Sequence, residues 1–383
     1  MLTETLFLIG LIGVSYSYFI YPLILTFISK IKKDNRKYLD DNKTNYINKI
    51  SFIITAYNEE KHIESKITNT LKTKYPLSQL EILVASDGSS DKTNEIVNNY
   101  PSDIVKLIDV KDRKGKENAQ LRAIQQAKGD ILVFSDVTTQ IEPEAIHIIN
   151  KTFADPIVGA ISSEDCFVSA DGKVAGEGAY VKYEMWLRKL EGKVNTLVGL
   201  SGSFFAARKE ICENWDISVP SDFNTALNCV KKSHVAISEP TLLGFYPNLK
   251  DESKEYERKL RTVIRGIAAL FTHIEVLNPF KYGLFAFQIF SHKVMRWLVP
   301  WFLILTTYLN TILLSDSILY CIILVPQILL YLAAFIGWLS VKSRNLTAIK
   351  IPYFFIQVNI AIAHASIQYL FGKRVTMWKP SKR

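Results

Sequence analysis

The chain has 383 residues and a formal net charge of +9, and 48% of its residues are hydrophobic. Its four cysteines, Cys166, Cys212, Cys229 and Cys321, lie far apart, which excludes a disulfide scaffold and predicts free buried thiols in a reducing compartment. Nucleic acid is the first partner that a basic chain brings to mind, but no nucleic-acid-binding motif occurs, and the positive charge gathers beside hydrophobic segments. We therefore expect a membrane as partner and no nucleic acid.

The first hydrophobic segment predicts a membrane anchor within residues 1–30. The stretch Leu6–Ile28 contains no charged side chain and is long enough to cross a hydrocarbon layer of about 30 Å. A cleaved signal peptide is the alternative, but residues 1–5 hold no Lys or Arg, and a basic cluster follows the segment at Lys30, Lys32, Lys33, Arg36 and Lys37. Because such clusters stay on the cytoplasmic side, we expect an integral protein of the cytoplasmic membrane with residues 48–280 in the cytoplasm.

Residues 281–383 predict further membrane segments. The runs 298–314 and 318–339 form a hairpin of two spans, and 282–297 mixes aromatic with basic residues, as an interfacial helix does. The run 349–370 is long enough to span, yet it carries Gln357, His364 and Gln368. The basic tail after it favours an interfacial or re-entrant element and a cytoplasmic C-terminus, with a fourth span as the close alternative.

The middle of the chain reads as an α/β domain. Short apolar runs at 50–57, 80–86, 104–110 and 130–134 alternate with helix-like stretches at 61–71, 92–99 and 120–127. This alternation predicts a doubly wound parallel sheet, in which ligands bind beyond the carboxyl ends of the strands. Thr55–Glu59, Asp87–Asp91 and Asp136 all fall at such ends, so we expect them to share one site.

Motifs at these positions carry a resemblance to a known family. The segments are Thr-Ala-Tyr-Asn-Glu-Glu at 55–60, Ser-Asp-Gly-Ser-Ser-Asp at 86–91, Gly-Lys at 115–116, Phe-Ser-Asp-Val-Thr-Thr at 134–139, and Leu-Ser-Gly-Ser-Phe-Phe at 200–205 with Ser-Asp-Phe at 221–223. Together, over about residues 50–275, they resemble family 2 glycosyltransferases. The resemblance implies a GT-A fold with a mostly parallel sheet, flanked by transmembrane helices as in the polysaccharide-making members.

The resemblance implies roles on the side of the nucleotide-sugar donor. Asp87 stands where the family's carboxylate holds uracil or ribose, although an Asp-Gly pair also makes an ordinary turn. Lys116 stands near the diphosphate, its alternative being a solvated charge in a basic run. Arg261 stands where a cation neutralises the leaving diphosphate, although the family's Gln-x-x-Arg-Trp motif is poorly met. The other donor-binding residues implied are Thr55, Tyr57, Glu59, Ser135 and Asp136.

A metal site is implied at the end of the fourth strand. Asp136 is the first acid of the family's Asp-x-Asp pair, and Thr138 replaces the second. Mg²⁺ or Mn²⁺ prefers oxygen ligands and can lie between a carboxylate and phosphate, so we expect either ion at Asp136 and Thr138. A structural Asp at a strand end is the alternative.

Acceptor-side roles follow from the later motifs. Asp222 occupies the place of the family's general base, which removes the proton of the acceptor hydroxyl, although Ser221 replaces the acid that precedes it there. The alternative for Asp222 is an N-cap of a helix over 224–230. Gly202 and Ser203 belong to a loop beneath the acceptor. Glu184 and Trp186 belong to a helix lining it, although aromatic residues at helical spacing are more often part of a core.

The resemblance implies an inverting transferase that uses a nucleotide-diphosphate sugar, with UDP the expected nucleotide. The acceptor is expected to be lipid-linked or a saccharide at the cytoplasmic face, in the synthesis of cell-surface polysaccharide or glycoconjugate. A processive synthase coupled to export remains an alternative, disfavoured by the few spans and the missing Trp. A different class is a non-catalytic sugar-binding or transport membrane protein, but the spans carry few ionisable groups for a pathway.

Overall fold

A computed structural model describes residues 1–32, 47–168, 179–247 and 252–375 of the chain. It divides into two compact units. The sheet unit comprises Val375 and the described residues within 28–251 and 268–286, and the helical unit comprises residues 1–27, 252–267 and 287–374. Of the predicted basic tail, Lys379, Lys382 and Arg383 lie outside the described residues.

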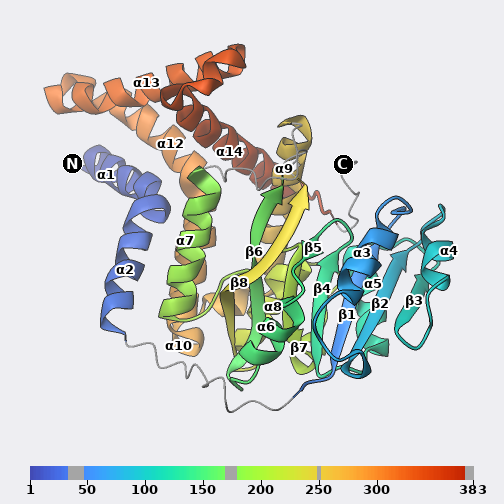
Figure 1. Cartoon of the computed structure of the whole chain (residues 1–383). Helices are drawn as coiled ribbons and strands as arrows, with labels where there is room; N and C mark the ends of the chain where they lie inside the picture. Colours follow the sequence, from blue (N-terminus) through green and yellow to red (C-terminus); the bar gives the residue numbers. More distant parts are fainter. Residues whose placement is uncertain (33–46, 169–178, 248–251, 376–383) are drawn as a thin grey trace. The chain divides into compact units, whose positions relative to one another are not determined.

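The sheet unit is built on one eight-stranded mixed sheet with the strand order β3-β2-β1-β4-β7-β6-β8-β5 (Figure 1). Neighbours among β1, β2, β3 and β4 are parallel, whereas β7 runs antiparallel to both β4 and β6. The strand bounds are Ile50–Ala56, Leu80–Asp87, Val105–Val110, Ile131–Asp136, Gln140–Ile141, Val158–Val168, Phe204–Arg208 and Val235–Pro247 for β1 to β8. This mostly parallel sheet confirms the predicted fold class.

Helices cover both faces of the sheet because its central strands are apolar on both sides. Along β1, Phe52 and Ile54 contribute to one buried cluster with residues of α3 (Ile63–Leu71), α4 (Thr93–Asn98) and α6 (Ala145–Thr152). Ile53 contributes to the opposite cluster with residues of α5 (Lys116–Gln126) and α8 (Ser221–Lys231). The remaining helices of the unit are α7 (Ala179–Val194), α10 (Pro279–Tyr282) and the short 3-10 turns Leu77–Gln79, Lys209–Cys212 and Ile274–Leu277.

The predicted strands agree with the structure to within one or two residues, but two helices begin earlier than expected. The helix α5 begins at Lys116 rather than residue 120, because Gly115 adopts a φ of 102° and turns the chain directly into the helix. The helix α8 begins at Ser221 rather than residue 224, after Pro220, whose fixed φ suits the position before a helix.

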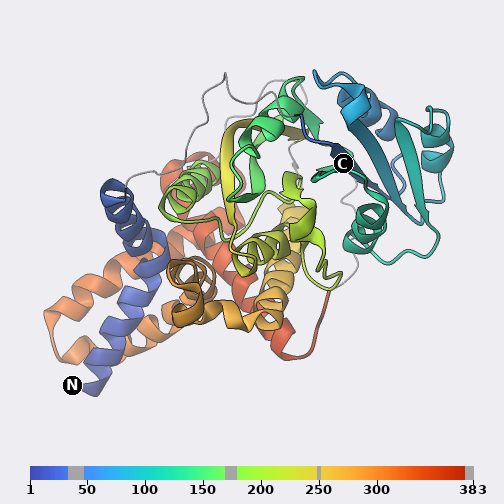
Figure 2. The same cartoon turned by 90° about the horizontal axis from the view of Figure 1, so that it is seen from below.

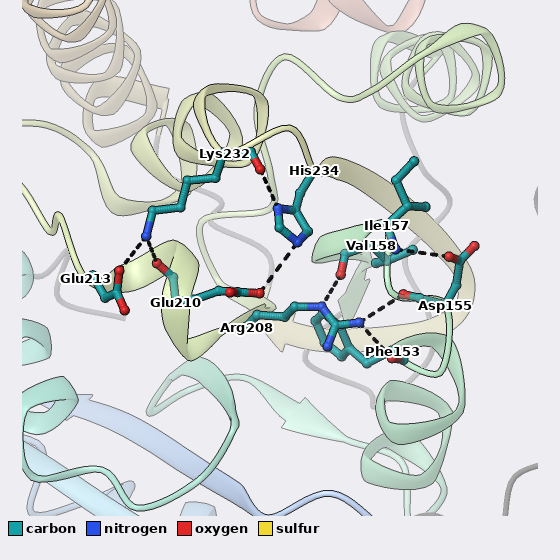
Figure 3. A network of polar contacts seen from close by, with 9 residues as sticks. All are labelled: Phe153, Asp155, Ile157, Val158, Arg208, Glu210, Glu213, Lys232 and His234. Atoms are coloured by element: carbon teal, nitrogen blue, oxygen red, sulfur yellow. Dashed lines mark hydrogen bonds and ion pairs between the residues drawn. The ribbon is translucent and has the colours of Figure 1, made fainter.

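A polar network fixes the acceptor-side strands at the end away from the predicted site (Figure 3). At the end of β7, Arg208 donates from Nε to the carbonyl of Val158 at 2.7 Å, and from Nη2 to the carbonyls of Phe153 and Asp155 at 2.8 and 2.9 Å. Close by, Lys232 forms a 2.6 Å ion pair with Glu213. The contacts of Arg208 hold the start of β6 against the end of β7.

The helical unit contains most of the chain's long apolar helices. Its elements are α1 (Leu2–Ser15), a π turn (Tyr16–Ile20), α2 (Tyr21–Ile31), α9 (Glu252–Thr272), α11 (Leu284–Ile289), a π turn (Phe290–Val294), α12 (Met295–Ile312), α13 (Ile318–Leu339) and α14 (Thr347–Leu370), with 3-10 turns at Leu313–Ser315 and Lys342–Asn345. Three of these, α2, α9 and α11, continue into the sheet unit.

Four helical segments in the described part of the chain are long and apolar enough to cross a membrane. They are Leu2–Ile31, Leu284–Ser315, Ile318–Leu339 and Thr347–Leu370. The helix predicted separately at the interface, 282–297, instead continues into α12 through the π turn. Its polar residues are enclosed by protein: His292 is buried, and the guanidinium of Arg296 lies 5.1 Å from the ring centroid of Tyr18.

The N-terminal helix α1 packs tightly on α12 (Figures 1 and 2). A Cβ added at Gly10 would lie 2.7 Å from Thr306, and one at Gly13 would lie 2.5 Å from Phe302. Small residues allow this close approach of helices, which is typical of packing within membranes. The polar stripe on α14 also has protein partners: His364 bonds to Tyr256 of α9 at 3.0 Å and to Gln368 at 2.8 Å. Packing against another helix therefore accounts for this stripe, and the placement of α14 in a membrane stays a prediction.

Candidate active site

The carboxyl ends of β1, β2 and β4 meet at one edge of the sheet, as predicted from their sequences. Thr55 of β1 pairs in register with Asp136 of β4, and Ala56 pairs with Ser86 of β2. Asp87 is the last residue of β2 and Asp136 the last of β4. The sheet therefore brings Thr55, Asp87 and Asp136 to one edge.

The loops after β1 and β2 interlock. The side chain of Asn58 accepts from the backbone N–H of Ser90 at 2.8 Å, and the backbone N–H of Glu59 donates to Thr93 at 2.8 Å. Asn58 adopts a φ of 53°, which Asn tolerates better than most residues. These hydrogen bonds between the two loops hold Tyr57 and Glu59 beside the carboxyl ends of β1 and β2, at the rim of the candidate site.

Tyr57 stacks with Arg113, whose guanidinium carbon lies 3.6 Å from the ring centroid. A base bound at this rim would find a planar aromatic and cationic surface. Nearby, the hydroxyl of Thr55 is buried and has no hydrogen-bond partner among the described residues. Ser135 is also buried, and its hydroxyl donates to the carbonyl of Asp136 at 3.2 Å. Of these, Thr55 is the one with a polar atom left for a ligand.

Asp87 is buried, and both its carboxylate oxygens accept backbone hydrogen bonds. Oδ1 accepts from the N–H of Lys114 at 3.0 Å and Oδ2 from the N–H of Gly115 at 2.9 Å. Gly88, with a φ of 70°, allows the chain to turn sharply after it. Asp87 thus holds the loop that leads into α5. Each oxygen keeps a further lone pair, so the predicted contact with a donor nucleotide is open to it.

Lys116 joins the end of β4 to the loop before β7. Its Nζ lies 2.5 Å from Oδ1 of Asp136 and donates to the carbonyl of Gly202 at 2.9 Å. Its side chain is only 14% exposed. The alternative reading of Lys116 as a solvated charge is therefore wrong. The lysine therefore lies beside Asp136, and its contact with a donor diphosphate stays a prediction.

Lys66 is a residue of this region that the sequence motifs do not contain. It is fully buried on α3, and its Nζ donates to the carbonyl of Thr139 at 2.5 Å, in the turn after Asp136. Burial lowers the pKa of Lys66 to about 7, while the charge of Asp136 opposes this shift. The available signal is positional: Ile63, Lys66, Ile67 and Thr70 form the buried stripe of α3, where a lysine is out of place.

Hydrogen bonds fix the loop 200–203 between the donor motifs and Asp222. Arg188 donates to the carbonyl of Leu200 at 3.3 Å, and the N–H of Ser201 donates to the hydroxyl oxygen of Ser162 at 2.8 Å. The N–H of Asp136 donates to the carbonyl of Ser203 at 3.0 Å. With Lys116 on Gly202, this loop is a rigid platform rather than a flexible connection.

Asp222 lies in the first turn of α8, directly against this platform. A Cβ added at Gly202 would lie 3.3 Å from Oδ2 of Asp222. The cap of α8 is Pro220, and the helix has no side-chain cap, so Asp222 is not its N-cap. Within the described part of the chain, no hydrogen bond or ion pair engages its carboxylate. Asp222 is thus a half-buried carboxylate with free lone pairs, as a general base requires.

A second carboxylate on this side, Asp165, was not predicted. It lies on β6 and accepts from the hydroxyl of Ser201 at 2.5 Å. The pKa of Asp165 is raised chiefly by burial of its carboxyl, and the nearby charge of Asp222 raises it further. Arg188, Ser201 and Tyr246 oppose the rise. The pairing of β6 with β8 places Asp165 beside the loop 200–203, and no local sequence motif predicts that pairing.

The other predicted residues are placed as follows. Glu184 and Trp186 lie on α7, the helix that also carries Arg188, and Trp186 is 45% exposed, so it is not part of a core. Arg261 lies on α9 in the helical unit, and its contact with the donor stays a prediction. Thr138 is half-buried in the turn after β4.

The described residues hold no group of three or more His, Cys, Asp or Glu side chains that could bind a metal ion. The predicted oxygen ligands are the carboxylate of Asp136, one oxygen of which is paired with Lys116, and the hydroxyl of Thr138, two residues apart in one turn. Mg²⁺-type sites commonly use one or two protein ligands and complete their shell with substrate phosphates and water. The residues present therefore fit a metal ion that arrives with a diphosphate, and they do not fit a resident ion held by protein alone.

Comparison with known proteins agrees with this geometry. Residues 51–214 match the model of glycosyl transferase family 2. These residues are a family 2 glycosyltransferase domain. The matched region contains the donor-side residues and Gly202 but ends before Asp222 and Arg261.

Relatives and a solved structure extend the comparison. The chain is 27% identical over 207 residues to a poly-beta-1,6-N-acetyl-D-glucosamine synthase of Staphylococcus epidermidis, covering 52% of the chain and 50% of that protein. It is 28% identical over 176 residues to a synthase of the same name from Staphylococcus aureus, covering 44% and 42%. The chain therefore spans about half the length of the curated relatives it matches, or less. A mannosyltransferase from Pyrobaculum calidifontis, solved in complex with GDP-Man and Mn²⁺, has the same fold at 19% identity, with a TM-score of 0.73 and coverage of 97% of this chain and 100% of that one.

Proposed function

We propose that the protein is an inverting membrane glycosyltransferase that moves a sugar from a nucleotide-diphosphate donor to an acceptor hydroxyl. The observation that carries the proposal is the arrangement around the loop 200–203. On one side Lys116 and Asp136 provide a charged site for a diphosphate, and on the other Asp222 provides an unpaired carboxylate. Such an arrangement lets a base deprotonate the acceptor while the diphosphate leaves from the opposite side of the sugar carbon.

The donor nucleotide is placed at the ends of β1 and β2. Tyr57 and Arg113 offer a stacking surface for the base, and Thr55 and Asp87 offer a hydroxyl and carboxylate oxygens for the base or ribose. UDP is the expected nucleotide, although the similar archaeal structure carries GDP-Man. Ring stacking alone accepts either base, so the choice between them rests on polar contacts at the rim.

The diphosphate is placed at Lys116, Asp136 and Thr138. Mg²⁺ or Mn²⁺, held by Asp136 and Thr138 together with the diphosphate, would supply positive charge for the leaving group. Lys116 pairs with Oδ1 of Asp136, so Oδ2 of the same carboxylate is the oxygen that would bind the metal ion, while the ammonium would contact the diphosphate beside it. Arg261 is a further cation for the leaving diphosphate.

The acceptor is placed on the loop 200–203, with its reactive hydroxyl toward Asp222. The carboxylate takes the hydroxyl proton as the oxygen attacks the sugar carbon. Gly202 leaves room for this approach, because a side chain there would crowd Oδ2 of Asp222. Ser203, Glu184 and Trp186 complete the acceptor side, where an exposed tryptophan suits the apolar face of a sugar.

Four long apolar helices support a location in a membrane. We place the glycosyltransferase domain in the cytoplasm, where nucleotide sugars are made, and expect a lipid-linked or saccharide acceptor of cell-surface polysaccharide or glycoconjugate synthesis. Cysteine labelling at Ser381 with an impermeant reagent in intact cells tests the C-terminus. Protection is expected, and labelling from outside would contradict a cytoplasmic tail.

A processive polysaccharide synthase is the second candidate, favoured by the names of the staphylococcal relatives. The product separates the two. A single-addition enzyme yields acceptor extended by one sugar at every donor-to-acceptor ratio. A processive enzyme yields long chains while unextended acceptor remains.

The test of the proposal is a panel of UDP-, GDP- and CDP-sugars, each measured for binding and slow hydrolysis by the purified full chain in detergent with Mn²⁺. One nucleotide class is expected to bind at micromolar to millimolar concentration and to be hydrolysed. Absence of binding by every donor would overturn the proposal.

A further inference from the structure

The buried lysine on α3 invites an explanation because ionised lysines are among the side chains least often buried. Lys66 is 0% exposed, and it takes a position of the helix stripe whose neighbours Ile63 and Ile67 pack into the core. Burying an ammonium costs free energy unless it is paired and hydrogen-bonded. An apolar side chain of similar length would fill the same space without that cost, so the fold alone does not account for the lysine.

The contacts of Lys66 point to the turn after β4. Its Nζ donates to the carbonyl of Thr139 at 2.5 Å and lies 5.1 Å from the ring centroid of Phe52. The turn itself closes with the N–H of Thr139 donating to the carbonyl of Asp136 at 3.2 Å. The charge of Asp136 raises the pKa of Lys66, against the larger lowering caused by burial. Lys66 therefore bonds to the last residue of a turn whose first residue is Asp136.

We propose that Lys66 is a positioning residue of the donor site, which holds the turn 136–139 from beneath so that Asp136 and Thr138 face the metal and diphosphate. Lys116 contacts Asp136 from the half-open side, where a diphosphate can replace the contact, whereas Lys66 is enclosed and stays in place. Lys116 can thus move when the donor binds, whereas Lys66 keeps the turn 136–139 in place. This inference rests on the proposed function, since it concerns the same donor site.

The proposal predicts opposite effects on stability and on donor binding. Replacing a buried charge by an apolar side chain of similar volume is often neutral or stabilising. Lys66→Met is therefore expected to keep or raise the Tm. Its affinity for a nucleoside diphosphate with Mn²⁺ is expected to fall about tenfold to a hundredfold, as for the loss of a hydrogen bond from a charged group. A merely structural lysine would instead lower both or change neither.

The experiment compares the full chain with Lys66→Met and with Lys72→Met, a change of an exposed lysine at the end of the same helix. Titration with UDP and GDP, each with Mn²⁺, is measured beside Tm and beside binding of uridine and guanosine alone. We expect a loss of affinity only in Lys66→Met, and only for UDP and GDP and not for uridine and guanosine. Equal diphosphate affinity in Lys66→Met and wild type would overturn the proposal. So would a fall in Tm that accounts for the loss.

A double-mutant cycle with Asp136 tests whether Lys66 affects diphosphate affinity through the turn 136–139. If Lys66 acts through the turn, Lys66→Met should cost little further affinity once Asp136→Ala has removed the ligand, so the two effects should not add. Additive effects would overturn the proposal. Failure of the wild type to bind any nucleoside diphosphate is a separate result, because it contradicts the proposed function before Lys66 is tested.

Discussion

The donor half of the sheet, β3-β2-β1-β4 with its loops, differs from the acceptor half, β7-β6-β8 with α8, in how its carboxylates are engaged. In the donor half, Asp87 is bound by two backbone N–H groups and Asp136 by an ion pair with Lys116. In the acceptor half, Asp222 has no such partner among the described residues. The donor-side carboxylates are therefore held in position by protein groups, whereas the carboxylate that we propose as the base has no protein partner among the described residues. This difference predicts that mutations in the two halves change different measured quantities.

The largest expected effect is on the acceptor half. Asp222→Asn should reduce the rate of transfer by about 10²- to 10⁴-fold, because the amide cannot take up the hydroxyl proton. Affinity for the donor should stay within about twofold of wild type. Initial rates and donor titrations on the same preparation check both quantities. Transfer close to the wild-type rate would remove Asp222 from the mechanism.

The corresponding change in the donor half should act on binding. Asp136→Ala removes the carboxylate ligand and should weaken binding of nucleoside diphosphate by about tenfold or more when Mn²⁺ is present. Without metal the loss should be smaller, because Lys116, released from its ion pair, remains free to contact phosphate. Calorimetric titration with and without Mn²⁺ checks this, and an affinity unchanged in both conditions would place the diphosphate elsewhere.

A smaller effect is expected where the two halves meet. Gly202→Ala places a Cβ 3.3 Å from Oδ2 of Asp222, so the base has to shift by a few tenths of an ångström. We expect the transfer rate to fall about threefold to tenfold with donor affinity retained, since small misplacements of reacting groups reduce rates steeply. Gly199→Ala is the matched control, because its added Cβ would meet Phe223 at an ordinary 3.8 Å. Equal rates in both variants would argue against crowding at the base.

The sequence predicted the donor half better than the acceptor half for a physical reason. Asp87 and Asp136 each directly follow a short apolar run, so the strand and the site residue are predicted from one local stretch of sequence. The position of Asp165 depends instead on the pairing of β6 with the distant β8, whose register no local pattern states. Lys66 was readable in principle as the charged member of a buried helix stripe, but its target, the carbonyl of Thr139, is a backbone atom that no motif reveals.

Two particular predictions changed, one because of local backbone geometry and one because of packing between helices. The helix α8 begins at Ser221, so Asp222 is within the first turn and is not its cap. The segment 282–297 has its polar residues enclosed by neighbouring helices, and it continues into α12 where the sequence alone predicted a separate interfacial helix. The start of α8 is decided by the backbone at the neighbouring Pro220, whereas the surroundings of 282–297 are decided by residues from a distant part of the chain, such as Tyr18 beside Arg296.

The most direct test of the account is the anomeric configuration of the product. A single unpaired base beside the diphosphate site predicts one direct displacement, and therefore inversion at the transferred sugar carbon. Nuclear magnetic resonance of the product made by the full chain from a donor of known configuration measures this. Inversion is the predicted result. Retention would contradict the account, because a retained centre requires a second displacement or another nucleophile, and neither is provided by Asp222 acting as a base.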